Sequence, residues 1–143
     1  MEKEVRIYIK GNQYIENGEV SEESVVEETA VGKLYERNGK LYVTFEEVTE
    51  EDPVPNKVII KISDSSFELT RKGLLTSNFI FEKENAHKSD YVTPFGIFKM
   101  CVFTKDLSIS VYEEKINLHA VYDMEINDEF AGENETTVEI TVI

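Results

Sequence analysis

Apolar and polar residues alternate with a period of two along most of the chain. The alternation is clearest in residues 5–9, 67–70, 107–111 and 138–142. Successive side chains of a β-strand point to opposite faces, so the pattern indicates strands with one face in a core and the other in water. Parallel strands are buried on both faces and do not alternate, so these strands are expected to pair antiparallel.

Ten segments are predicted as strands, at the spacing typical of a barrel or a sandwich. They are residues 5–14, 24–36, 41–48, 57–62, 67–71, 78–83, 97–104, 107–112, 116–126 and 135–142. Asn38-Gly39 is predicted to join the second and third strands in a tight hairpin, because both residues tolerate positive φ. Residues 104–106 are predicted as a tight turn, and residues 50–56, 84–90 and 127–134 as longer loops.

Residues 24–36 are open to two interpretations. Ser21 is a candidate helix cap, with Val26 and Leu34 on one helical face. The many β-branched residues and Gly32 inside the run disfavour a helix. A strand is favoured, with Gly32 at a sharp bend.

Both ends of the sequence are predicted strands, and open strand edges would invite aggregation. Closure into a barrel removes this problem, and a barrel of about eight strands can hold one small ligand. The predicted fold is therefore a single all-β domain over residues 1–143, a closed or nearly closed antiparallel up-and-down barrel of about eight to ten strands. A β-sandwich is the alternative. The residues predicted to lie in the core include Val43, Phe45, Leu69, Phe98, Met100, Leu118 and Ile140.

Composition narrows the choice of partners. Asp and Glu number 29 against 15 Lys and Arg, which gives a formal net charge of -14. This charge repels phosphate backbones and anionic lipids, so neither nucleic acid nor a membrane is expected as a partner. We find no apolar run long enough for a membrane helix, no signal-peptide pattern and only one cysteine, Cys101, so a cytoplasmic location is expected.

Four polar residues continue otherwise apolar strand faces: Glu28, Glu47, Arg71 and Tyr122. An unpaired buried charge is costly, and a guanidinium can hold a carboxylate with two hydrogen bonds. Arg71 and Glu47 are therefore predicted to pair at one end of the barrel. The pair either closes that end as a structural element or lines the mouth of a ligand pocket.

Four short elements follow one another along the chain: residues 45–47 (Phe-Glu-Glu), 71–73 (Arg-Lys-Gly), 91–96 (Tyr-Val-Thr-Pro-Phe-Gly) and 118–122 (Leu-His-Ala-Val-Tyr). In this order they resemble the YwiB-like family, uncharacterised bacterial proteins grouped as a domain of unknown function. The resemblance covers nearly the whole chain and implies a lipocalin-like (calycin-like) β-barrel. The family has no established activity, so the resemblance implies a fold and no chemistry.

The Thr-Pro-Phe-Gly element of residues 93–96 also has a physical interpretation of its own. Pro94 pre-sets the first central position of a turn and holds Thr93 in an extended conformation. The simplest interpretation is a corner of the barrel. The alternative is that Tyr91 and Thr93 present hydroxyl groups at the barrel mouth near Arg71.

The sequence contains no catalytic or metal-binding motif. His87 and His119 are the only histidines and lie in different segments, so a metal site is not expected. A nucleophile elbow, a phosphate-binding glycine loop and a Cys/His dyad are all missing from the sequence. No cofactor is therefore expected, and an enzyme ranks below two other classes of function.

The first class is a barrel that binds a small molecule, with an anionic group facing Arg71. The candidate ligand contacts are Arg71, Glu47, Glu28, Tyr91, Thr93 and Tyr122. The second class is a protein-interaction or structural module whose core is filled, with another protein or a second copy of the chain as its partner. An open cavity would favour the first class, and a filled barrel would favour the second.

Overall fold

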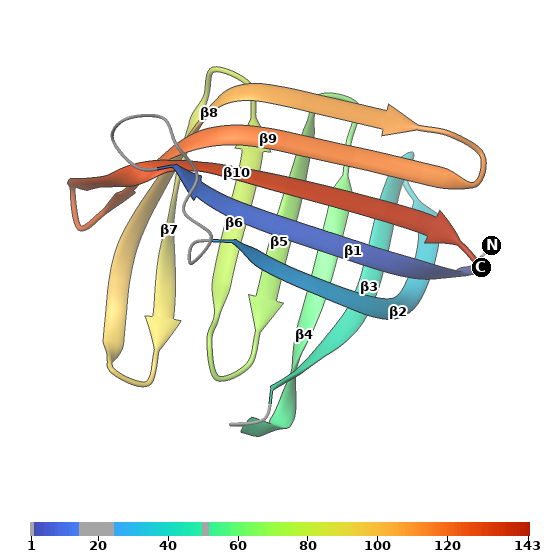
Figure 1. The fold of residues 1–143 in the computed structure, drawn as a ribbon, viewed down its shortest axis with the longest axis horizontal. Coiled ribbons are helices and arrows are strands. Elements are labelled where there is room, and N and C mark those ends of the chain that lie inside the picture. Colours follow the sequence, from blue (N-terminus) through green and yellow to red (C-terminus); the bar gives the residue numbers. More distant parts are fainter. Residues whose placement is uncertain (1, 15–24, 50–51) are drawn as a thin grey trace.

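The computed structural model describes residues 2–14, 25–49 and 52–143, and their regular secondary structure is β-strand throughout (Figure 1). The strands of this described part are β1 (Lys3–Tyr14), β2 (Val26–Arg37), β3 (Lys40–Thr49), β4 (Asp52–Ile62), β5 (Ser66–Lys72), β6 (Ser77–Glu82), β7 (Ala86–Thr93), β8 (Gly96–Val111), β9 (Lys115–Ile126) and β10 (Glu129–Val142). These residues contain no helix that could span a membrane.

The described strands form one antiparallel sheet in the order β6-β5-β4-β3-β2-β1-β10-β9-β8-β7. Strands that follow one another in sequence lie side by side, and β1 pairs with β10, so the arrangement is up-and-down. The sheet curls until β6 approaches β7 (Figure 1), where Thr76 and Val92 exchange backbone hydrogen bonds of 3.0 and 2.9 Å. The predicted nearly closed barrel is confirmed, and the β-sandwich alternative is set aside.

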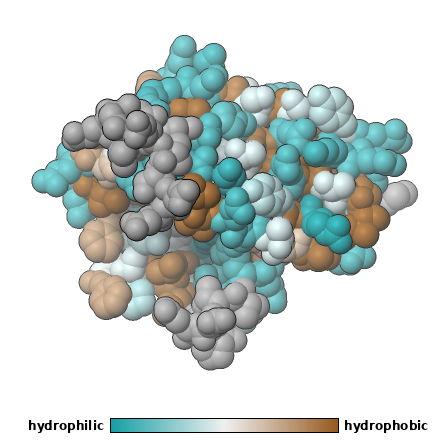
Figure 2. All heavy atoms as spheres, viewed as in Figure 1, coloured by the Kyte–Doolittle hydropathy of each residue, from teal (hydrophilic) through white to brown (hydrophobic). Residues whose placement is uncertain are grey.

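The inward-facing side chains form one hydrophobic cluster inside the barrel. The surface seen in Figure 2 is largely hydrophilic, with hydrophobic residues interspersed, as expected for strands that alternate between core and solvent. Most of the predicted core is therefore confirmed. The predicted residues that are buried are Val43, Phe45, Leu69, Met100, Leu118 and Ile140.

The prediction for Phe98 is wrong, because 38% of this residue is exposed. Phe98 has the same phase as Met100, but β8 pairs with β9 only from Met100 onward. Phe98 lies in the part of the β7–β8 hairpin that extends beyond the pairing of β8 with β9. The alternation along a strand shows which face is inward but not where the strand leaves the barrel.

Residues 104–106 form a β-bulge within one long strand, not the predicted turn. The register between β8 and β9 shifts between Thr104 and Asp106 while the strand continues to Val111. The extra residue moves the inward phase from even to odd positions, so the alternation is interrupted without a turn. The two strands predicted on either side of this point are therefore one.

The predicted loop of residues 84–90 is wrong, because β7 occupies most of it. Within the predicted loop, its inward-facing residues His87 and Ser89 are polar and contact β6 across the seam where the barrel closes. Ser89 Oγ donates to the carbonyl oxygen of Asn78 at 2.9 Å, and His87 Nε2 lies 3.2 Å from Glu82 Oε1. These polar contacts explain why the segment lacks the alternation of a half-buried strand.

Two other predicted loops are shorter than expected. In residues 127–134, positive φ angles of 52° and 68° at Asn127 and Asp128 make a tight turn, and β10 begins directly after it at Glu129. In residues 50–56, β4 begins at Asp52, and residues 50–51 lie outside the described part.

The segment open to two interpretations is the predicted strand, β2, and not a helix. It forms the predicted hairpin with β3 through Asn38 and Gly39, whose φ angles are 53° and 76°. Both angles are positive, as a two-residue turn between twisted strands requires.

β2 and β3 diverge beyond this hairpin. Their pairing stops at Lys33 and Thr44, although β2 stays paired with β1 as far as Val26. The backbones approach closely at Gly32, where an added Cβ would lie 2.2 Å from the carbonyl oxygen of Thr44. We call the opening between residues 26–32 of β2 and residues 45–49 of β3 the fork (Figure 1).

Candidate ligand-binding site at the barrel mouth

Arg71 joins two glutamates at the end of the barrel where the fork opens. Its Nε lies 3.1 and 3.2 Å from the two carboxylate oxygens of Glu47, and its Nη2 lies 3.6 Å from Glu28 Oε1. The predicted ion pair between Arg71 and Glu47 is confirmed. Glu28 belongs to the same cluster, because its inward position on β2 places it across the fork from Glu47.

The cluster links β2 and β3 through side chains at a level where their backbones are not hydrogen-bonded to each other. Glu28 lies on β2 and Glu47 on β3, which are not hydrogen-bonded to each other at this level. Arg71 reaches both from β5, two strands beyond β3 in the sheet. The guanidinium therefore connects the two sides of the fork.

The electrostatic balance of the cluster is unusual, because two carboxyl groups share one guanidinium. The pKa of Glu28 is raised from 4.5 to about 7, first by burial and then by the hydrogen bond and negative charge of Glu47, against the opposing effect of Arg71. Glu28 Oε1 is buried and has no hydrogen-bond partner among the described residues. A neutral Glu28 therefore balances the cluster, and an ionised Glu28 leaves one negative charge in excess.

The charged cluster lines a cavity of about 280 Å³ at the barrel mouth. Aromatic residues form one wall: the ring centroids of Phe81 and Tyr122 are 4.9 Å apart, and those of Phe79 and Phe81 are 6.0 Å apart. The remaining lining residues are Ile9, Gly11, Val26, Leu69 and Thr136. The cavity thus combines apolar walls with a few convergent polar groups, as small-molecule sites usually do.

Tyr122 lies at the inner wall of this cavity and is buried. Its hydroxyl is 3.1 Å from Thr136 Oγ1 on the neighbouring strand. Burial raises the pKa of Tyr122, so the phenol stays neutral and offers hydrogen bonding without charge. Thr136 and the two phenylalanines were not among the predicted site residues, because nothing in their local sequence distinguishes them from other inward positions.

Tyr91 and Thr93 do not line this cavity. Thr93 Oγ1 donates to the carbonyl oxygen of Gly96 at 2.9 Å and accepts from the backbone N–H of Phe95 at 3.1 Å. These bonds shape the turn between β7 and β8, in agreement with the interpretation of residues 93–96 as a corner. Tyr91 packs against the core cluster.

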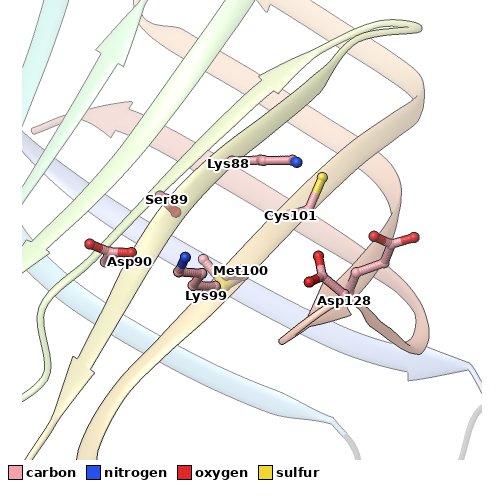
Figure 3. Close-up of a pocket in the computed structure, with 8 residues that line it drawn as sticks. Lys88, Ser89, Asp90, Lys99, Met100, Cys101 and Asp128 are labelled. Carbon is pink, nitrogen blue, oxygen red and sulfur yellow. The ribbon is translucent and has the colours of Figure 1, made fainter.

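A second depression, of about 500 Å³, lies on the outer face of β7 and β8. Figure 3 shows Lys88 beside Cys101 and Lys99 beside Met100, and Glu125 and Asp128 also line the depression. The charges are mixed and exposed, and the depression has no aromatic wall. The described residues contain no group of three or more His, Cys, Asp or Glu side chains that could hold a metal ion. The barrel mouth is therefore the better candidate site.

Comparisons with known proteins agree with this architecture. A protein-family model described as "Domain of unknown function (DUF1934)" matches residues 7–138. The uncharacterized β-barrel protein YwiB of Bacillus subtilis (strain 168) is 27% identical over 129 residues, which cover 90% of this chain and 88% of YwiB. The crystal structure of the ywiB protein from Bacillus subtilis has a TM-score of 0.81 at 22% identity and covers 99% of this chain and 93% of that one, which shows a common fold.

Proposed function

The chain belongs to the DUF1934 family of YwiB-like β-barrels, and we propose that its mouth binds a small molecule with a positively charged amino group on an apolar body. The proposal keeps the class predicted from the sequence, a barrel that binds a small ligand. It differs in the charge of the ligand, because the structure pairs Arg71 with two carboxyl groups.

Glu28 is the observation that carries the proposal. Its Oε1 is buried without a hydrogen-bond donor among the described residues, and it shares Arg71 with Glu47. A buried carboxylate requires a cation or several donors to offset its desolvation. An ammonium group in the cavity would supply both a charge and donors to Glu28.

The same geometry disfavours an anionic ligand. Arg71 Nε is already held by both oxygens of Glu47, whose side chain is only 11% exposed. An anion would have to compete with two carboxylates for one guanidinium. A cation instead completes the balance when both glutamates are ionised.

The walls of the cavity suit the remainder of such a ligand. A volume of about 280 Å³ accommodates a molecule with one ring or an equivalent apolar group. Phe79, Phe81 and Tyr122 line the cavity, where an apolar body would contact them, and a cation beside an aromatic face gains about 0.5–2 kcal/mol.

The second class of function, a protein-interaction module, is supported by other features. Below the mouth cavity, inward-facing hydrophobic side chains fill the interior of the barrel. Ligand binding in the barrel is therefore confined to the mouth. The fork favours a protein partner, because β2 and β3 leave backbone groups there that are not paired with each other.

The charge of the ligand is tested with two probes of similar shape, 2-phenylethylamine and 3-phenylpropionate. Titration by calorimetry and by NMR at pH 8, where Glu28 is ionised, is expected to show binding of the amine and not of the carboxylate. Glu28→Gln is expected to weaken binding of the amine about tenfold or more, because a charge-assisted hydrogen bond contributes about 1.5–3 kcal/mol.

Glu36→Gln is the matched control, because Glu36 is exposed and lies on the same strand, close to the hairpin. It removes the same charge from β2 and is expected to leave binding unchanged. Tighter binding of 3-phenylpropionate, or equal binding of the amine by the wild type and Glu28→Gln, would contradict the proposal.

A further inference from the structure

Among the described residues, the fork leaves two strand edges that face each other without a backbone partner. Residues 26–32 pair with β1 on their other side, and residues 45–49 pair with β4. No backbone hydrogen bond joins the two edges in the part of the chain that the structure describes. Unpaired strand edges are templates for the addition of a further strand.

The direction of the backbone groups follows from the hairpin between β2 and β3. In a two-residue hairpin the flanking residues, here Arg37 and Lys40, exchange both hydrogen bonds. Backbone N–H and C=O groups alternate between the two neighbours of a strand. Glu27, Thr29 and Val31 therefore direct these groups into the fork, and residue 46 does so from β3.

Space lies on both faces of the fork. On the inner face is the mouth cavity, and on the outer face is a groove of about 640 Å³ lined by Val31, Thr44 and Ile59 among others. Val26 and Val31 are 68% and 55% exposed, although both are apolar strand residues. A strand that entered the fork would have room for side chains on alternate faces.

We infer that the fork accepts an extended basic peptide of another protein as an additional β-strand. An extended backbone offers donors and acceptors in the spacing of a strand edge. This inference does not require a small-molecule ligand, because strand addition rests on backbone groups of β2 and β3, although two of the glutamates that favour a basic peptide also line the mouth cavity.

Charge decides between a peptide from another protein and a second copy of the chain. The two edges carry the glutamates Glu27, Glu28, Glu46 and Glu47. In the described part of the chain, three bases lie beside these four glutamates: Lys10 opposite Glu27, Lys57 opposite Glu46, and Arg71, so the edges keep an excess of acid in a protein of net charge -14. A second copy would bring like charge, whereas lysine or arginine side chains on a peptide bring opposite charge.

Amide hydrogen exchange of the full chain tests the edge directly. In the free protein, the amides of Thr29 and Val31 are expected to exchange faster than those of Ala30 and Gly32, which pair with β1. An acetylated and amidated hexapeptide of alternating lysine and valine is expected to bind and to slow exchange at Thr29 and Val31 about tenfold or more. A hexapeptide with glutamate in place of lysine is expected to bind more weakly.

Two controls separate strand addition from attraction between charged side chains. The same lysine–valine peptide, N-methylated at alternate residues, keeps its charge but loses the backbone donors on one of its edges. Its affinity is expected to be lower by about tenfold or more. Thr29→Pro removes a donor that faces the fork and is expected to weaken binding similarly, whereas Thr29→Val keeps it and leaves binding unchanged. If Thr29→Pro does not fold, the methylated peptide still decides.

Three results would overturn the inference. The first is no binding of the lysine–valine peptide at millimolar concentration. The second is equal binding of the methylated and unmethylated peptides. The third is protection of Thr29 and Val31 in the free protein that increases with protein concentration, because a second copy would then occupy the fork.

Discussion

Replacing Glu28 with glutamine tests the electrostatics of the barrel mouth through stability. Burial and the neighbouring Glu47 raise the pKa of Glu28 from 4.5 to about 7. A carboxyl group with a raised pKa binds its proton more tightly in the folded protein than in the unfolded chain. Its protonated form therefore stabilises the fold fully below pH 4.5, and this contribution is lost as the pH rises through about 7.

The size of the effect follows from the two pKa values. The difference between 4.5 and about 7 corresponds to about 3 kcal/mol at 1.36 kcal/mol per pH unit. Because 32% of the Glu28 side chain is exposed, solvent screening reduces this to about 1–2 kcal/mol. Glutamine does not titrate, so the free energy of unfolding of Glu28→Gln, relative to wild type, is expected to rise by that amount between pH 4.5 and 8.

Urea denaturation of the wild type and Glu28→Gln at several pH values between 4.5 and 8 measures this difference. Glu36→Gln, an exposed change on the same strand, corrects for the altered net charge. A difference between the two variants that does not change with pH would refute the reasoning. So would an NMR titration that places the pKa of Glu28 at its ordinary value of 4.5.

Three other predictions follow from the packing of the barrel. Arg71→Met and Glu47→Gln are each expected to destabilise, because the first leaves two partly buried carboxyl groups without a cation and the second weakens the hydrogen bonding of Arg71 while Glu28 stays beside it. The double variant is expected to recover about 0.5–3 kcal/mol, and additive losses in urea would show that the pair is not coupled. Phe81→Ala is expected to cost about 3–5 kcal/mol because Phe81 is 1% exposed, and Phe98→Ala about 1 kcal/mol or less; equal losses in thermal melts would place Phe98 in the core. Gly32→Ala is expected to cost about 1–3 kcal/mol, because the added Cβ would lie 2.2 Å from a carbonyl oxygen of β3; wild-type stability in urea would contradict this close approach.

The local sequence determined much of the barrel, because alternation is a property of each strand alone. It also predicted the pairing of Arg71 and Glu47, since both continue an apolar face and each would be costly to bury alone. The strand β2 was recognised from the β-branched residues around Gly32. In these cases the residue and its neighbours along the chain carry the relevant information.

The closure of the barrel could not be predicted in this way. β7 was missed because its inward residues His87 and Ser89 are polar, and they are polar because they contact β6 across the seam. The bulge near Thr104 resembled a turn, since a shift of phase and a break between strands look alike in one sequence. Phe98 has the correct phase but lies beyond the last strand that could cover it.

The candidate site shows the same division. Glu28, Glu47, Arg71 and Tyr122 were recognisable as polar residues on apolar faces and were grouped as candidate ligand contacts, but which other residues line the same cavity was not predictable. Their meeting depends on how far β2 and β3 diverge after Gly32, which is a property of the curved sheet and not of any one strand. The charge of the expected ligand changed for this reason: along the sequence Arg71 has one partner, whereas in the barrel it shares its charge between two carboxyl groups.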